Sequence, residues 1–144
     1  MGTKAKKRLK IILDTNVLVS ALLFRGELSV LVPLWKDGAF IPFFSKETFA
    51  EFKAVLAYPK FKLTQDEIDR IIQEEVLPYF EVVAVTHPVF GVCKDRHDDK
   101  FLSCAVSARA DMLVSGDRAL YQLKKFKSVK VVSPAAFIGE INKG

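Results

Sequence analysis

One stretch near the N-terminus decides the predicted fold: Lys10-Ile11-Ile12-Leu13-Asp14-Thr15-Asn16. Its three apolar residues form a short unbroken run, which is typical of a strand buried on both faces of a parallel sheet. Asp14 stands where this run stops. Because ligands bind at the carboxyl ends of the strands in an open α/β sheet, Asp14 is a candidate functional residue. It is also a good N-cap for the helix that follows, so this stretch alone leaves both interpretations open.

The rest of the chain repeats the alternation of apolar strands and amphipathic helices. Strands are predicted at 10–13, 39–44, 80–85, 112–114 and 129–132. Helices are predicted at 16–24, 27–36, 46–58, 65–77, 101–110, 117–123 and from 134 onward. This alternation predicts an α/β fold, with a parallel sheet of four to five strands and helices on both faces. Pro42 argues for an edge or irregular position of the second strand.

Length and composition predict a single domain over residues 1–144. Half of the residues are hydrophobic and 27% are charged, which excludes a disordered chain. No apolar run is long enough to cross a bilayer, and the basic residues 1–8, which we expect to be mobile, do not lead into a signal-peptide core. Cys93 and Cys104 do not form a metal-type pair, so we expect reduced thiols and a cytoplasmic protein. The net charge of +5 favours a polyanionic partner.

Acidic residues stand at several of the predicted element ends. Asp14 follows the first strand, Asp98 and Asp99 precede the helix 101–110, and Asp117 follows the strand 112–114. Helix capping explains each of them singly. It does not explain why the same edge of the sheet should collect them all. Glu51 lies inside the third predicted helix, where Glu47, one turn earlier, competes for the same role.

Carboxylates that are brought close together repel each other unless a cation lies between them. Mg²⁺ and Mn²⁺ resolve this conflict because they prefer carboxylate and water oxygens and keep positions open for phosphate. A site of this kind needs neither imidazole nor thiolate. We therefore interpret His87 and His97, which both fall in loop-like stretches, as surface residues.

Four short motifs follow one another along the chain. They are Leu13-Asp14-Thr15-Asn16-Val17-Leu18-Val19, Thr48-Phe49-Ala50-Glu51-Phe52-Lys53-Ala54-Val55-Leu56, Asp95-Arg96-His97-Asp98-Asp99-Lys100-Phe101-Leu102 and Val114-Ser115-Gly116-Asp117. In this order they resemble the PIN-domain ribonucleases, and within that family the toxins of bacterial and archaeal toxin–antitoxin pairs. The resemblance covers nearly the whole chain, 9–138.

The resemblance implies which acids form the site. The implied catalytic and metal-binding residues are Asp14, Glu51, Asp99 and Asp117, which would hold one or two Mg²⁺ or Mn²⁺ ions. Asp99 is preferred to Asp98 because Asp99, Leu102 and Ala105 match the family spacing of acid, aliphatic residue and alanine. Asp98 and Asp95 remain alternative or additional ligands. Polar neighbours would orient the acids, namely Thr15, Asn16 and Ser115.

The implied activity is metal-assisted hydrolysis of phosphodiester bonds in RNA, without a covalent intermediate or a histidine base. Lys46, Lys100 and Arg118 stand beside the acid motifs and are candidate phosphate contacts. The implied partners are RNA, a cognate antitoxin that covers or enters the cleft, and a second copy in a homodimer; no membrane is involved. The apolar residues Trp35 and 40–44 belong either to a dimer surface or to the core.

Two other function classes remain as alternatives. A haloacid-dehalogenase-type phosphatase also places an aspartate after its first strand, but it requires a second aspartate where this chain has Asn16. The other alternative is a catalytically silent PIN-like or receiver-like module that binds metal or RNA without cutting it.

Overall fold

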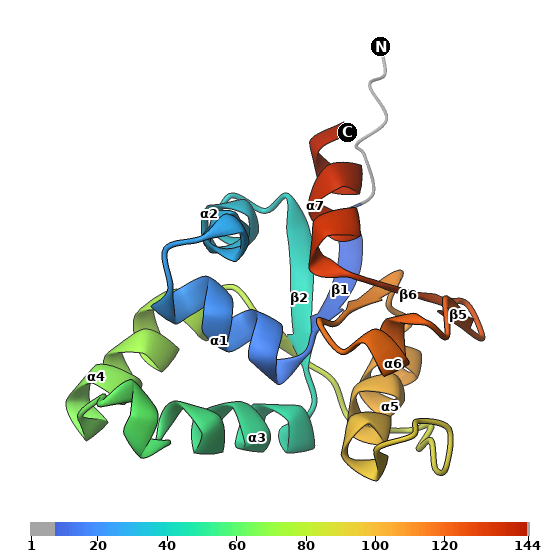
Figure 1. The fold of residues 1–144 in the computed structure, drawn as a ribbon, viewed down its shortest axis with the longest axis horizontal. Helices are drawn as coiled ribbons and strands as arrows, with labels where there is room; N and C mark the ends of the chain where they lie inside the picture. The colour runs from blue at the N-terminus through green and yellow to red at the C-terminus, as the bar shows by residue number, and fades with distance from the viewer. Residues whose placement is uncertain (1–7, 144) are drawn as a thin grey trace.

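A mixed β-sheet with helices on both faces forms the centre of the protein (Figure 1), whose computed structural model describes residues 8–143. Within this range the sheet has six strands in the order β3-β2-β1-β4-β6-β5. The strands are β1 (Leu9–Leu13), β2 (Phe40–Phe44), β3 (Glu81–Val82), β4 (Met112–Val114), β5 (Lys125–Phe126) and β6 (Val129–Val132). All neighbouring strands pair in parallel except β5 and β6, which are antiparallel. The predicted α/β class is confirmed, with more strands than the four to five expected.

The first strand lies in the middle of the sheet. Its Ile11 is in register with Pro42 of β2 on one side, and its Leu13 with Val114 of β4 on the other. Successive side chains of a strand point to opposite faces, so Ile11 and Leu13 enter one hydrophobic core and Ile12 enters the other. Burial on both faces is the physical reason for the unbroken apolar run.

Seven α-helices surround the sheet within residues 8–143. They are α1 (Thr15–Leu23), α2 (Leu31–Lys36), α3 (Lys46–Leu56), α4 (Gln65–Arg70), α5 (Asp99–Ala108), α6 (Arg118–Tyr121) and α7 (Pro134–Lys143). Further helical segments are the 3₁₀ turns η1 (Glu27–Val30), η2 (Pro59–Phe61) and η4 (Arg96–Asp98), and the π-helix η3 (Ile71–Val76). Capping residues fix the starts of two helices: Ser45 and Thr48 form a capping box on α3, and Thr64 and Glu67 form one on α4.

The helices divide unequally between the two faces of the sheet. Residues of α1, α2, α3, α4, η3 and α7 form one core with Ile11 and Leu13, whereas α5 and α6 cover the other face with Ile12. Figure 1 shows α3 and α5 near the end of the sheet at which β1 and β2 finish. This end of the sheet therefore receives residues from several elements that are distant in sequence.

Several details differ from the sequence-based predictions. The predicted strand 80–85 is only two residues long in β3, and the predicted helix 27–36 divides into η1 and α2. Strand β2 is interior rather than an edge strand. It tolerates Pro42 because β3 pairs only with Phe43 and Phe44, so no strand hydrogen-bonds to that side of β2 at the proline.

The aromatic residues that were ambiguous between core and dimer surface belong to the core. Trp35, Phe40, Phe43 and Phe44 are all buried. Phe40 packs edge-on against Phe137 of α7, with ring centroids 5.2 Å apart. The expectation that residues 1–8 are mobile falls almost entirely outside the described range, which begins at Arg8.

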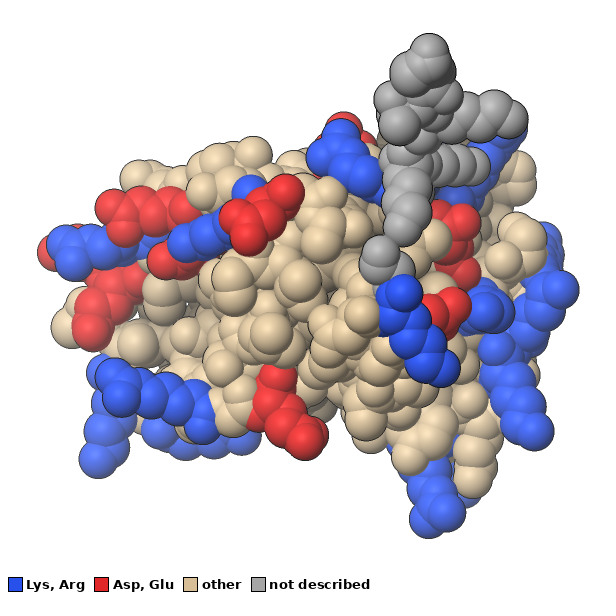
Figure 2. All heavy atoms as spheres, turned by 90° about the horizontal axis from the view of Figure 1, so that it is seen from above, with Lys and Arg blue, Asp and Glu red and all other residues tan. Residues whose placement is uncertain are grey.

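The surface charges are unevenly distributed. Seen from above in Figure 2, Lys and Arg gather on the side where β5 and β6 lie, whereas both signs of charge cover the opposite side over α4. Between residues 8 and 143 no single helix is both long and apolar enough to cross a membrane. Helix α1 and the segment Glu27–Lys36 would pass that test together, but they meet at 88° and their apolar residues pack in the core.

Candidate functional site

Asp14 is fixed at the end of β1. Its backbone N–H donates to the carbonyl of Val114 in the neighbouring strand, at 3.0 Å. Its carboxylate accepts from the Val17 N–H at 2.8 Å, as the N-cap of α1, and from the Ser115 hydroxyl. The residue is 6% exposed. Burial raises the pKa of the Asp14 carboxyl above its usual value, while the hydrogen bonds from Ser115 and Val17 partly offset that effect.

Asp117 and Asp98 meet beside Asp14. Asp117 follows β4 and caps α6 by accepting from the Ala119 N–H at 3.0 Å. Asp98 lies at the end of η4, immediately before α5. Burial raises the pKa of Asp98 to about 7, and a hydrogen bond to Asp117 and the negative charges of Asp117, Asp95 and Asp14 add to the shift. These acids are therefore in electrostatic conflict in the protein without a cation.

Glu51 approaches from α3. It accepts a hydrogen bond from the hydroxyl of Thr15, the residue after Asp14, and forms an ion pair with Lys100 of α5 at 2.7 Å. These contacts join α1, α3 and α5 at the same end of the sheet. The preference for Glu51 over Glu47 agrees with this arrangement, because Glu47 is exposed and does not line the cavity described next.

A cavity of about 300 Å³ separates these side chains. We call it the acid cavity; its acidic lining residues are Asp14, Glu51, Asp95, Asp98 and Asp117. Three of the four acids predicted from the sequence, Asp14, Glu51 and Asp117, therefore lie around one cavity. The structure also brings in Asp98 and Asp95, the alternatives that the sequence left open.

Asp99 occupies a different position: it does not line the acid cavity, whereas Asp98 does. Its carboxylate accepts from the backbone N–H groups of Gly91 and Cys93, each at 2.8 Å. Burial opposes its ionisation, but these backbone donors and the Cys93 thiol outweigh burial and hold the pKa of Asp99 below its usual value. Successive residues of a helix point in different directions, about 100° apart, so a shift of one position moves an acid from the cavity to the loop.

A polar stripe on α5 explains why Asp99 faces that loop. Asp99, Ser103 and Ser107 recur every fourth residue and therefore share one face of the helix. Ser103 accepts from the Val89 N–H at 2.8 Å, and Ser107 from the N–H groups of Thr86 and His87 at 3.0 and 3.1 Å. These three side chains bind the extended segment 86–93 to α5. The family spacing that favoured Asp99 did not distinguish a cavity residue from a loop-binding one.

The donor set of the acid cavity fits a hard divalent cation. All its acidic groups are carboxylates, and the negative charges of Asp117, Asp95 and Asp14 help to raise the pKa of Asp98, an effect that a bound cation would oppose. In the arrangement of residues 8–143, no three His, Cys, Asp or Glu side chains are close enough to hold one ion. Glu51 is engaged by Thr15 and Lys100, so coordination by all four acids would require side-chain rearrangement.

The basic residues are arranged differently from the sequence-based expectation. Lys100 pairs with Glu51, and neither Lys46 nor Arg118 lines the acid cavity. Lys60 of η2 lines it instead, together with Tyr58 and His97. Tyr58 and Lys60 lie in a turn between α3 and α4 that gave no sequence signal, because it reaches the cavity only through the packing of the helices.

Comparison with known proteins gives a family match and several relatives. The model of the PIN domain family matches residues 10–119. The uncharacterized protein MJ1680 of Methanocaldococcus jannaschii is 28% identical, over 99% of this chain and 98% of its own length. The FitAcB structure from Neisseria gonorrhoeae has a TM-score of 0.59 at 18% identity, over 87% of this chain and 98% of the other.

Two further solved structures share this fold. VapBC2 from Rickettsia felis, bound to a DNA fragment from its promoter, has a TM-score of 0.56 at 16% identity, over 87% of this chain and 98% of the other. The PIN domain endonuclease Utp24 has a TM-score of 0.50 at 17% identity, over 86% of this chain and 84% of the other. The family match spans all the acidic residues that line the acid cavity, from Asp14 to Asp117. The chain therefore belongs to the PIN domain family.

Proposed function

We propose that this protein is a metal-dependent endoribonuclease and the toxin of a toxin–antitoxin pair. The observation that carries the proposal is the acid cavity, where Asp14, Asp98 and Asp117 converge from different parts of the chain. Burial and the charges of Asp117, Asp95 and Asp14 raise the pKa of Asp98 to about 7, which is the effect expected of carboxylates that lie close together without a cation. Membership of the PIN domain family, which includes the endonuclease Utp24, supports nuclease activity. The same membership argues against the phosphatase hypothesis.

The proposed reaction is hydrolysis. Water adds to phosphorus, one P–O ester bond breaks, and the products are a phosphate monoester and a free hydroxyl. Mg²⁺ or Mn²⁺, held by Asp14, Asp98 and Asp117 with Glu51 nearby, would supply positive charge that polarises the phosphate and activates the water. Ser115 and the Val17 N–H hold the Asp14 carboxylate in place, and Thr15 and Lys100 hold Glu51. Assignment of these roles, including Asp98 in place of Asp99, is part of the proposal.

Substitution of Asp14 tests the nuclease proposal directly. Asparagine is as good an N-cap as aspartate, so Asp14→Asn should fold normally while losing one negative ligand. We expect Mn²⁺-dependent cleavage of single-stranded RNA by the wild type, its loss in a chelator, and no cleavage by Asp14→Asn. Asp66→Asn, an exposed acid at the start of α4, is the matched control and should cleave normally. Full activity of a folded Asp14→Asn protein would refute the proposal.

A second candidate is a silent PIN module that binds metal or RNA without cutting. The engagement of Glu51 by Lys100 and Thr15 favours it, because that carboxylate is not free for a cation in this conformation. Binding of Mn²⁺ and RNA by the wild type with no cleavage under any metal would select this candidate.

The toxin assignment rests on the fold shared with FitAcB and VapBC2 and is tested in cells. We expect expression of the wild type to arrest growth, the Asp14→Asn variant to be harmless, and a protein encoded beside the toxin to suppress the arrest. A cytoplasmic location and a homodimer belong to the same proposal. Equal growth with either chain would contradict the toxin role and leave the nuclease proposal standing.

A further inference from the structure

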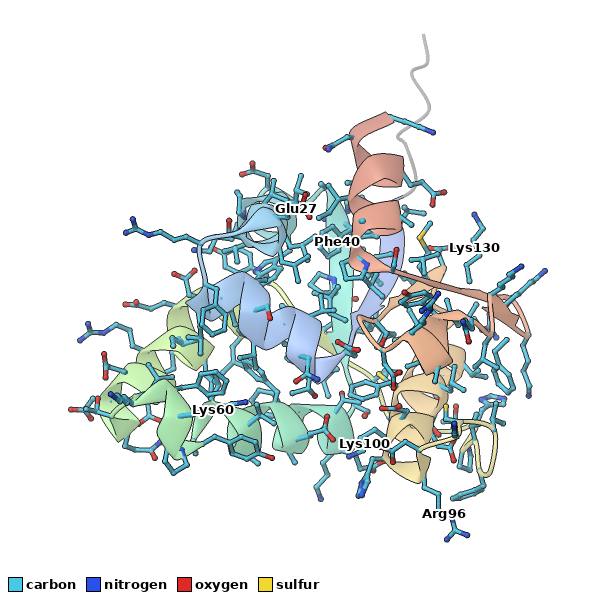
Figure 3. The ribbon with its side chains drawn as sticks, viewed as in Figure 1. Glu27, Phe40, Lys60, Arg96, Lys100 and Lys130 are labelled. Carbon is cyan, nitrogen blue, oxygen red and sulfur yellow. The ribbon has the colours of Figure 1, made fainter. Side chains whose placement is uncertain are left out.

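Lys60 is a positively charged residue that lies beside the acids of the cavity. Among residues 8–143, Lys60 is the only Lys or Arg that lines the acid cavity. Within the same range it has no carboxylate partner within ion-pair distance, whereas Lys100 is paired with Glu51. Figure 3 shows Lys60 in the region between α1 and α3. A free ammonium group therefore stands at the rim of a cavity whose acids would hold a cation.

The turn that carries Lys60 also presents aromatic rings. The Lys60 ammonium lies over the ring of Phe61, 5.1 Å from its centroid, which holds the lysine by a cation–π contact. The Phe61 ring in turn packs against Phe24, with centroids 6.2 Å apart. Phe24, the residue after α1, is 54% exposed. About half of this aromatic side chain is therefore accessible to a ligand.

A second hollow, of about 480 Å³, lies beside the acid cavity between α1 and η2. We call it the aromatic hollow; its lining includes Asn16, Val19, Phe24, Lys60, Phe61 and Leu63. It shares Asn16, Lys60 and Phe61 with the acid cavity. The two hollows are therefore adjacent, and Lys60 lines both of them.

We propose that the aromatic hollow is the subsite for the nucleotide next to the bond that is cut. In this arrangement the acid cavity receives the scissile phosphate, Lys60 binds a phosphate oxygen, and the neighbouring base stacks on Phe24. The inference rests on the proposed function, because it names where that function's RNA substrate lies.

The chemistry of single-stranded RNA matches each part of this subsite. Unpaired bases stack on exposed aromatic side chains, and lysine binds phosphate as a point charge. A polyanion entering an acidic cavity needs compensating positive charge, which Lys60 is positioned to supply in addition to a bound metal ion. A protein segment docking by apolar contact would use Phe24 but would have no need for the unpaired ammonium of Lys60.

The test measures binding of a fluorescent oligouridylate to Asp14→Asn protein in Mn²⁺, so that cleavage does not interfere. Lys60→Met should weaken binding by about tenfold and flatten the dependence of log affinity on log salt by about 0.7, the contribution of one phosphate contact on a single strand. Lys60→Arg should retain most of the affinity. Phe24→Ser should also weaken binding, by roughly tenfold or more.

Lys53 provides a matched control. Its ammonium also lies over a phenylalanine ring, Phe49, at 5.3 Å, but it does not line the acid cavity. Lys53→Met should bind the oligouridylate like its parent. Mn²⁺ binding, followed as the metal-induced rise in Tm, should be kept or strengthened in Lys60→Met, since removing a positive charge does not weaken a cation site.

The outcomes separate this inference from the nuclease proposal. If the wild type cleaves RNA and the Lys60 and Phe24 variants bind and cleave normally, the subsite is wrong and the nuclease stands. If the wild type never cleaves but both variants lose RNA binding, the aromatic hollow binds RNA without cleavage, and both the nuclease proposal and the subsite beside a cut bond are refuted. If Phe24→Ser alters only self-association or binding to a protein partner, the hollow is a protein interface and the inference is overturned. A wild type that binds no RNA refutes both.

Discussion

At the scale of single residues, the central feature is the conflict among the acids of the cavity. The raised pKa of Asp98 means that the folded protein holds this proton more tightly than the unfolded chain does, between pH 3.8 and about 7. The free energy of unfolding of the metal-free protein should therefore fall as pH rises through that window. The close approach of the carboxylates that would bind a cation thus destabilises the metal-free protein at higher pH.

Substitution of Asp98 by Asn removes this titration. Without metal, the Tm of Asp98→Asn should exceed that of the wild type by more at about pH 8 than at about pH 5, because only the wild type ionises the group. Mn²⁺ should raise the Tm of the wild type at the higher pH, by preferential binding to the folded state, and should do so less for Asp98→Asn. Thermal unfolding with chelator or Mn²⁺ measures both effects. A Tm difference that does not change with pH would contradict this account of Asp98.

At the scale of elements, the N-terminal end of α5 lies beside the acid cavity, and one face of the helix binds a loop. Asp98 and Asp99 are adjacent, yet one faces the cavity and the other holds the segment 86–93 through the N–H groups of Gly91 and Cys93. The segment 86–93 follows β3 and has little regular structure of its own. Its position therefore depends on hydrogen bonds to Asp99, Ser103 and Ser107.

Asp99→Ala should therefore loosen the loop without removing the metal site. The two part-buried hydrogen bonds to this charged acceptor contribute about 1.5–3 kcal/mol each, so amide exchange at Gly91 and Cys93 should accelerate. Ser103→Ala is the companion variant and should accelerate exchange at Val89 instead. Both variants should keep the Mn²⁺-induced rise in Tm. If Asp99→Ala abolished that rise while Asp98→Asn preserved it, Asp99 would be the ligand after all.

At the scale of the whole molecule, the cavity depends on helices that are packed on both faces of one sheet. Helix α7 contributes Phe137, which is fully buried against Phe40 in the core shared by α1 and α3. Phe137→Ala should lower the free energy of unfolding by about 3–5 kcal/mol, as large-to-small changes in a packed core do. Glu140→Ala on the exposed face of α7 removes only a surface pair with Lys130 and should cost less than about 1 kcal/mol. Urea unfolding compares the two, and equal losses would mean that α7 does not support this core.

Much of this organisation was predictable because local rules act on neighbouring residues. The apolar run of β1, the capping box at Ser45 and Thr48, and the Thr64–Glu67 cap all depend on residues a few positions apart. The antiparallel strand β5 was missed because Lys125 and Phe126 form too short a run to have a pattern. The predicted strand 80–85 was too long because its apolar residues pack beyond β3 without pairing.

The sequence by itself determined that strands alternate with helices and that Asp14 and Asp117 follow strands, because burial on two faces and capping leave local signatures. Only the tertiary structure decided that Asp98 rather than Asp99 lines the cavity, since the two acids are adjacent in sequence and differ only in the direction in which the backbone turns them. It also decided that Lys60, in a turn without a motif, reaches the acids. Such contacts depend on how the helices pack in space, which no window of neighbouring residues records.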